Sequence, residues 1–254
     1  MFDFEFPDIV IQLVAVLALL VVWRFYRVQV LAGRIMAIDI LDRSGIRMYI
    51  YAVPEDENVC EVCSTVNRRA FLPSYIVKKG FVPLPERCRR QVPCTGVLIG
   101  LYGAWPEARE IVQQLRSRSS KGWMQLSPEA LRALVDGPWE QSISADTDRM
   151  GVRMLEAICY ETINPAVSIA GYRYVAEEAK DIRHLCWVVP AYLRLAHLLM
   201  RSKEINHVLE VIERFESRFP ESRQGLYFPT REQRHGMKRK KALLQKNKPS
   251  HVAA

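Results

Sequence analysis

The sequence lacks the short motifs that mark the common classes of enzyme. It contains no P-loop, no G-x-S-x-G nucleophile elbow, no H-E-x-x-H metal motif and no G-x-G-x-x-G dinucleotide fingerprint. The histidines His184, His197 and His207 have no serine or carboxylate partner at a recognisable spacing. These absences argue against the common hydrolases, nucleotide-binding enzymes and zinc proteases. An enzyme is therefore the least favoured of the three functions compared below.

Glycine, proline and charge are all missing from the apolar run 9–23, which reads IVIQLVAVLALLVVW. As a helix this run spans about 22 Å, less than the roughly 30 Å hydrocarbon core of a bilayer. Aromatic residues on both sides extend it, and Arg24 and Arg27 can place their guanidinium groups among lipid headgroups. We therefore predict a transmembrane helix, with a buried core helix as the alternative.

No lysine or arginine precedes the apolar run, whereas Arg24, Arg27 and Arg34 follow it. A cleaved signal peptide would begin with basic residues and end with small ones, so we expect an uncleaved single-pass anchor. Basic flanks stay in the cytoplasm, which predicts an outside amino terminus and a cytoplasmic bulk. Thiols are kept reduced in that compartment, and this argues against a disulfide framework.

The chain contains six cysteines, and four of them lie close together in the sequence. Cys60 and Cys63 form a C-x2-C pair, and Cys88 and Cys94 form a looser C-x5-C pair. Two pairs of thiolates joined by a loop suit a closed tetrahedral zinc site at about 2.3 Å per bond. The spacing predicts one structural Zn2+ bound by these four cysteines, the second pair departing from the usual spacing.

Three other states of these cysteines stay open: reduced thiols without metal, disulfides, and an iron site. Redox chemistry at Cys60 and Cys63 is a further alternative, because the preceding RMYIYAV reads as a strand. No βαβ pattern follows this pair, however, and a redox role leaves Cys88 and Cys94 unexplained. Zinc accounts for both pairs.

The segments YIYAVPEDENVCEVCSTVNRRAF and PLPERCRRQVPC resemble the cysteine module in minor head proteins of tailed phages, in the order of strand, acidic turn, C-x-x-C and Pro-Cys segment. The match covers about 45 residues, and this chain lacks the long helical region expected before that module. The resemblance therefore implies a cysteine-stapled interaction module rather than a phage head role. Its matching positions are Cys60, Cys63, Cys88 and Cys94.

Beyond residue 104 the pattern is helical. PEAREIVQQLRSRS has a proline suited to a first turn, SPEALRALV begins with Ser127 as an N-cap, and TDRMGVRMLEAICYETI continues the apolar periodicity. Residues 190–222 predict two amphipathic helices around a polar turn near Lys203, and they resemble one tetratricopeptide repeat. One repeat cannot bury its own apolar face, so this hairpin must pack on other helices or on another chain.

The end of the chain is strongly basic, with eight lysines or arginines against one glutamate between residues 231 and 248. Blocks of like charge repel one another, which predicts a flexible tail. Three roles stay open for it: binding of anionic lipid, binding of RNA through phosphate contacts, and solubility alone.

These patterns predict a mainly α protein with four parts. The parts are a transmembrane anchor and juxtamembrane segment (1–33), a small four-cysteine zinc-binding module with short strands (34–104), a helical domain with a tetratricopeptide-like hairpin (105–224), and a basic flexible tail (225–254). The predicted function is a membrane-anchored, cytoplasm-facing adaptor or scaffold that binds a protein partner through its helical domain. The alternative is a nucleic-acid-associated protein that uses the zinc module and the basic tail.

Overall fold

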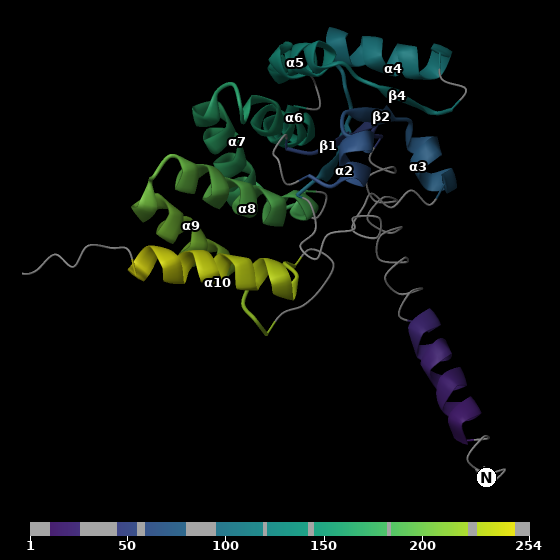
Figure 1. The fold of residues 1–254 in the computed structure, drawn as a ribbon. Helices are drawn as coiled ribbons and strands as arrows, with labels where there is room; N and C mark the ends of the chain where they lie inside the picture. Colours follow the sequence, from purple (N-terminus) through teal and green to yellow (C-terminus); the bar gives the residue numbers. More distant parts are fainter. Residues whose placement is uncertain are drawn as a thin grey trace, which may run out of the picture.

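The computed structural model describes residues 11–25, 45–54, 59–79, 95–118, 121–141, 145–181, 184–222 and 228–246. This part of the chain is mainly helical and contains a small antiparallel sheet, as the sequence predicts (Figure 1). Among the helices in these ranges, none is both long enough and apolar enough to cross a bilayer.

The sheet has the order β3-β1-β2-β4, and every pairing is antiparallel. Its strands are β1 (Met48–Ala52), β2 (Arg69–Phe71), β3 (Val97–Leu101) and β4 (Trp123–Gln125). The strand predicted from RMYIYAV is therefore the central strand β1, and Ile50 lies opposite both Ile99 and Ala70. Because β4 follows residue 104, the sheet takes strands from both sides of the boundary predicted there.

Every residue of β1 is buried because both faces of this strand are covered. Met48, Ile50 and Ala52 belong to the large core shared with the helices. Tyr49 and Tyr51 point to the opposite face and join a smaller core that includes Cys63, Phe71 and Ile76. Side chains alternate between the two faces of a strand, so β1 joins the cysteine segment to the helical body.

Nine α-helices follow β1. They are α2 (Glu61–Val66), α3 (Pro73–Lys79), α4 (Pro106–Arg118), α5 (Pro128–Asp136), α6 (Ala145–Tyr160), α7 (Pro165–Glu178), α8 (Leu185–Arg201), α9 (Ile205–Arg218) and α10 (Arg231–Lys246), with a 3-10 turn at Trp139–Gln141, all within the described residues. Ser127 caps α5 by accepting the amide of Ala130 at 3.1 Å, as predicted. Consecutive helices from α5 to α10 pack on one another beside the sheet (Figure 1).

The predicted hairpin is confirmed as α8 and α9, which turn at Lys203 with a left-handed φ of 60°. Tyr192 of α8 meets Phe215 of α9 edge to face at 5.7 Å between ring centroids. We expected the first helix to begin at Pro190, but α8 begins one turn earlier and contains this proline. The reason is Trp187, which is buried and donates its indole N–H to the carbonyl of Leu98 at 3.0 Å.

The basic segment forms helix α10 where the sequence predicted a flexible tail. Thr230 and Gln233 exchange side-chain hydrogen bonds with each other's amide groups at its start, which is a capping box. Met237 and Leu244 bury their side chains, and Lys241 pairs with Glu216 of α9 at 2.6 Å. Acidic side chains of the preceding helix thus offset part of the charge that favoured disorder.

Gly171 lets α7 approach α6 closely, and this contact gives a first prediction. A Cβ at this position would lie 2.9 Å from the carbonyl oxygen of Arg153 and 3.0 Å from the Cβ of Ala157. We expect Gly171→Ala to lower the free energy of unfolding by about 1–3 kcal/mol, as overpacking does elsewhere. Urea unfolding of the full chain in a non-ionic detergent measures this change.

The matched control is Gly236→Ala in α10, where an added methyl group meets nothing within 4 Å. Alanine favours the helix over glycine, so this control is expected to leave stability unchanged or slightly increased. Equal stability of the Gly171 variant and the unaltered chain would contradict the close packing of α6 and α7.

Candidate functional site

Cys60 and Cys63 lie at the start of α2, beside the sheet. Cys60 occupies the N-cap position in an extended conformation, and its Sγ accepts the amide hydrogen of Cys63 at 3.4 Å. Cys63 is 1% exposed and belongs to the smaller core, whereas Cys60 is half-buried. The C-x2-C sequence therefore folds into a compact turn that brings Cys60 and Cys63 close together.

A tight turn after α2 fixes this cysteine pair to the sheet. The side chain of Asn67 accepts the amide of Val53 at 2.9 Å, and the amide of Arg68 donates to the carbonyl of Tyr51 at 2.8 Å. Arg68 takes a left-handed φ of 60°, which a non-glycine residue adopts at some cost. The residues that follow the carboxyl end of α2 are thus tied to β1 and to the residue after it, and Cys63 packs in the smaller core beside the same strand.

The other two predicted zinc ligands, Cys88 and Cys94, lie outside the described residues. Within the described ranges no group of three or more metal-binding side chains is present, and no disulfide joins the cysteines there. The structure therefore describes half of the predicted donor set. Cys159 and Cys186 lie elsewhere, in α6 and α8.

A buried charged cluster joins three helical segments, and no pattern in the sequence indicated it. Arg194 of α8 donates from Nε to Oε1 of Glu161 at 2.9 Å and from Nη2 to Oε2 of the same carboxylate. The hydroxyl of Tyr172 in α7 donates to Oε1 at 2.5 Å. All three residues are at most 5% exposed. Both carboxylate oxygens have donors, so the cluster suits a structural role better than proton transfer.

The surroundings change the ionisation of two groups near this cluster. Burial, reinforced by the negative charge of Glu161, raises the pKa of Tyr172 well above its ordinary value and keeps the phenol protonated. Burial lowers the pKa of Lys240 in α10, and the positive charge of Arg194 lowers it further. The cluster therefore consists of the neutral phenol of Tyr172 and the ion pair of Arg194 with Glu161. Lys240 of α10 lies near it.

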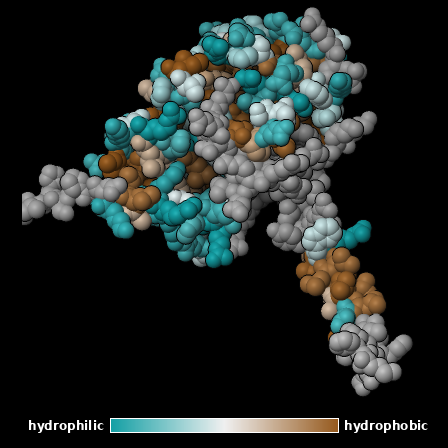
Figure 2. Space-filling model, in the orientation of Figure 1, coloured by the Kyte–Doolittle hydropathy of each residue, from teal (hydrophilic) through white to brown (hydrophobic). Residues whose placement is uncertain are grey.

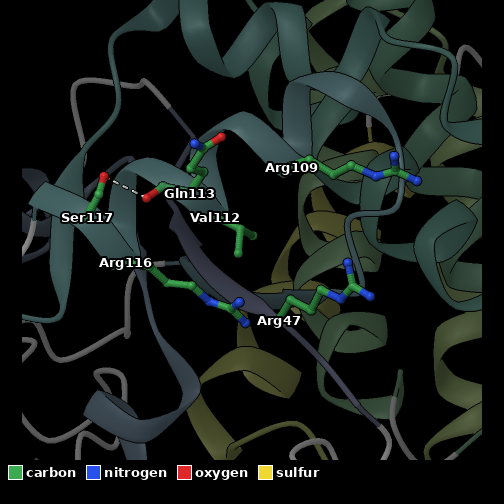
Figure 3. Close-up of a pocket in the computed structure, with 6 residues that line it drawn as sticks. All are labelled: Arg47, Arg109, Val112, Gln113, Arg116 and Ser117. Carbon is green, nitrogen blue, oxygen red and sulfur yellow. Dashed lines mark hydrogen bonds between the residues drawn. The ribbon is translucent and has the colours of Figure 1, made fainter.

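A second feature that sequence reasoning missed is a basic hollow of about 380 Å³ between α4 and the residues before β1 (Figure 3). Arg109 and Arg116 lie seven residues apart on α4, which places them on one face of the helix. Arg47 precedes β1, and its amide donates to the carbonyl of Leu101 at 3.0 Å. The spacing within α4 is visible in the sequence, but the approach of Arg47 depends on the tertiary fold.

The described part of the predicted anchor is a helix over residues 11–25. Every large apolar side chain in it is between 53% and 69% exposed. Figure 2 shows these side chains as a hydrophobic surface on this helix. In the rest of the described chain, the large apolar side chains exposed to this degree are Ile163 and Leu243.

Searches among protein-family models, curated proteins and solved structures found no match to this chain. A functional proposal must therefore rest on the chemistry of the cysteine pair, the exposed apolar helix and the charged surfaces described above.

Proposed function

We propose that the chain is a single-pass membrane adaptor or scaffold, with its bulk in the cytoplasm, a structural zinc site and a helical domain that binds a protein partner. The observation that carries this proposal is the exposure of the apolar side chains of helix 11–25. Contiguous apolar surface of this kind on a protein marks a membrane or protein contact. The basic residues Arg24, Arg27 and Arg34 after the run favour the membrane and set its orientation.

The cysteine pair supports the zinc part of the proposal. An amide that donates to the Sγ of Cys60 stabilises a thiolate there, and thiolate is the form that binds zinc. Cys88 and Cys94 would supply the other two ligands. A structural metal of this kind would hold the cysteine segment on the face of β1 that carries Tyr49 and Tyr51.

The α8–α9 hairpin supports the protein-binding part. The apolar face of α9 is covered by α8, and its other face is exposed and mostly polar or charged. That exposed face carries Asn206, His207, Glu210, Glu213, Arg214 and Ser217. A polar and charged helix surface suits a reversible protein contact better than an obligate apolar one.

The nucleic-acid alternative receives less support from α10. Lys238 pairs with Glu221, and Lys241 pairs with Glu216. Lysines already paired with carboxylates contribute less to phosphate binding than the composition of the tail suggests. We therefore keep the adaptor as the proposal.

The anchor can be tested by substitution within its apolar run. Leu17→Arg together with Leu20→Arg is expected to move the protein from the carbonate-resistant membrane pellet to the supernatant. Each arginine at the centre of a membrane helix costs about 2.5–3.5 kcal/mol on insertion scales. Carbonate extraction followed by immunoblotting measures the distribution.

The matched control is Ile163→Arg, since Ile163 is 57% exposed but lies outside the apolar run. This variant should remain in the pellet. A reporter fused after Ala254 should behave as cytoplasmic, and reporter activity on the outer side would overturn the proposed orientation. Unchanged pelleting of the double variant would overturn the anchor itself.

A further inference from the structure

Three arginines line the basic hollow. Figure 3 shows the side chain of Arg116 extending towards Arg47, and the side chain of Arg47 extending away from Arg116 towards the side on which the guanidinium group of Arg109 lies. All three residues are exposed, and among the described residues none of their guanidinium groups makes an ion pair or a side-chain hydrogen bond. On α9, by contrast, the exposed Arg214 is paired with Glu177 and Glu210.

The elements that carry these arginines are firmly held. Val112 of α4 lines the hollow and Leu115 is fully buried in the core, so this helix cannot turn its arginines away. Arg47 adjoins the fully buried strand β1 and is tied to β3 through its backbone. Like charges around one hollow repel one another, and an anion between them removes that repulsion.

The neutral side chains of the hollow add no competing charge. Ser117 donates its hydroxyl hydrogen to the carbonyl of Gln113 at 2.9 Å, so this hydroxyl is already committed to the helix. The volume of about 380 Å³ exceeds that of a single inorganic ion and suits a small phosphorylated group. Guanidinium groups bind phosphate through two parallel hydrogen bonds, a geometry that lysine cannot supply.

We infer that Arg47, Arg109 and Arg116 form a binding site for a phosphate monoester. The group is carried either by the headgroup of an anionic phospholipid or by a small soluble ester. Three cations match the charge of a phosphate dianion better than that of a single carboxylate. None of the lining residues belongs to α2 or to α10, and the site, which rests on the proposed function, adds a ligand to the proposed adaptor.

The test uses the full chain in non-ionic detergent micelles and measures affinity by calorimetry. One arm adds dioctanoyl phosphatidic acid, with dioctanoyl phosphatidylcholine as the headgroup control. The other arm adds glycerol 3-phosphate, with inorganic phosphate as the minimal probe. Binding in the first arm alone identifies a lipid source, and binding in both arms identifies a site that recognises the phosphate itself.

Single substitutions Arg47→Gln, Arg109→Gln and Arg116→Gln are expected to weaken binding about tenfold each, as loss of a charge-assisted hydrogen bond does. Arg109→Lys should recover only part of this loss because the paired hydrogen bonds are absent. The controls are Arg173→Gln in α7 and Arg239→Gln in α10, both exposed, and both should bind as the unaltered chain does.

Three results would overturn the inference. They are failure of the unaltered chain to bind in either arm, equal affinity of the triple glutamine variant, and an equal loss in the Arg173 control. If the first of these results is accompanied by binding of RNA, the arginines are assigned to a nucleic acid. Circular dichroism confirms that the exposed substitutions leave the helices intact.

Discussion

Replacing Arg194 by methionine is expected to lower the free energy of unfolding by about 3–5 kcal/mol. The substitution removes both donors that Arg194 directs at the carboxylate of Glu161 and leaves a buried negative charge with Tyr172 as its remaining donor. Glu161 is 4% exposed, so water cannot replace the lost hydrogen bonds. Urea unfolding of the full chain in non-ionic detergent, followed by tryptophan fluorescence, measures the loss.

The double variant Arg194→Met with Glu161→Leu is the matched control, because it removes the whole ion pair and leaves no buried charge. Replacing a buried pair by apolar residues is often close to neutral, so this variant should regain most of the lost stability. Glu161→Leu is also measured alone. If the losses of stability in the two single variants sum to the loss in the double variant, the two side chains do not interact.

The second large effect concerns the metal. The purified chain is expected to contain about one zinc, and Cys60→Ser or Cys63→Ser should abolish metal retention. A metal site rarely exists in an unfolded chain, so metal affinity contributes directly to folding. Removal of zinc should therefore unfold the cysteine segment around α2, while the helices from α4 onward keep the core that they share with β1 and β3.

Elemental analysis under reducing conditions and thiol counting before and after a chelator measure this effect. Substitution of Cys88 or Cys94 by serine should act like that of Cys60, whereas Cys159→Ser and Cys186→Ser in α6 and α8 should leave the metal content unchanged. Four cysteines that react freely in the native chain, without zinc, would leave the redox interpretation in place of the metal.

Local signals in the sequence predicted much of the fold. Ser127 and the proline after it marked the start of α5, and the apolar spacing around Lys203 marked the α8–α9 hairpin. The short strands β2 and β4 escaped prediction because three residues carry too little periodicity. Helix α10 escaped it because its stability depends on carboxylates of α9, which composition does not reveal.

The functional features also divide into those that a local stretch of sequence shows and those that depend on the tertiary fold. The cysteine pair and the apolar run are contiguous in sequence and were visible there. Glu161 and Arg194 lie 33 positions apart and meet only when α7 and α8 fold together. Arg47 lines the same hollow as Arg109 and Arg116 only because β1 pairs with β3 just before α4 begins. A single sequence does not show which positions far apart in the chain come together in the fold.

The central place of β1 also governs how the four cysteines can come together. β2 follows Cys63 in the chain, β3 follows Cys94, and both strands pair with β1. Once these pairings form, the chain between β2 and β3 is closed into a loop whether or not metal is present. The entropy lost on closing a loop grows with the logarithm of its length, and here that loss occurs during sheet formation. For the proposed zinc site, this means that the sheet raises the effective concentration of the second thiol pair near the first.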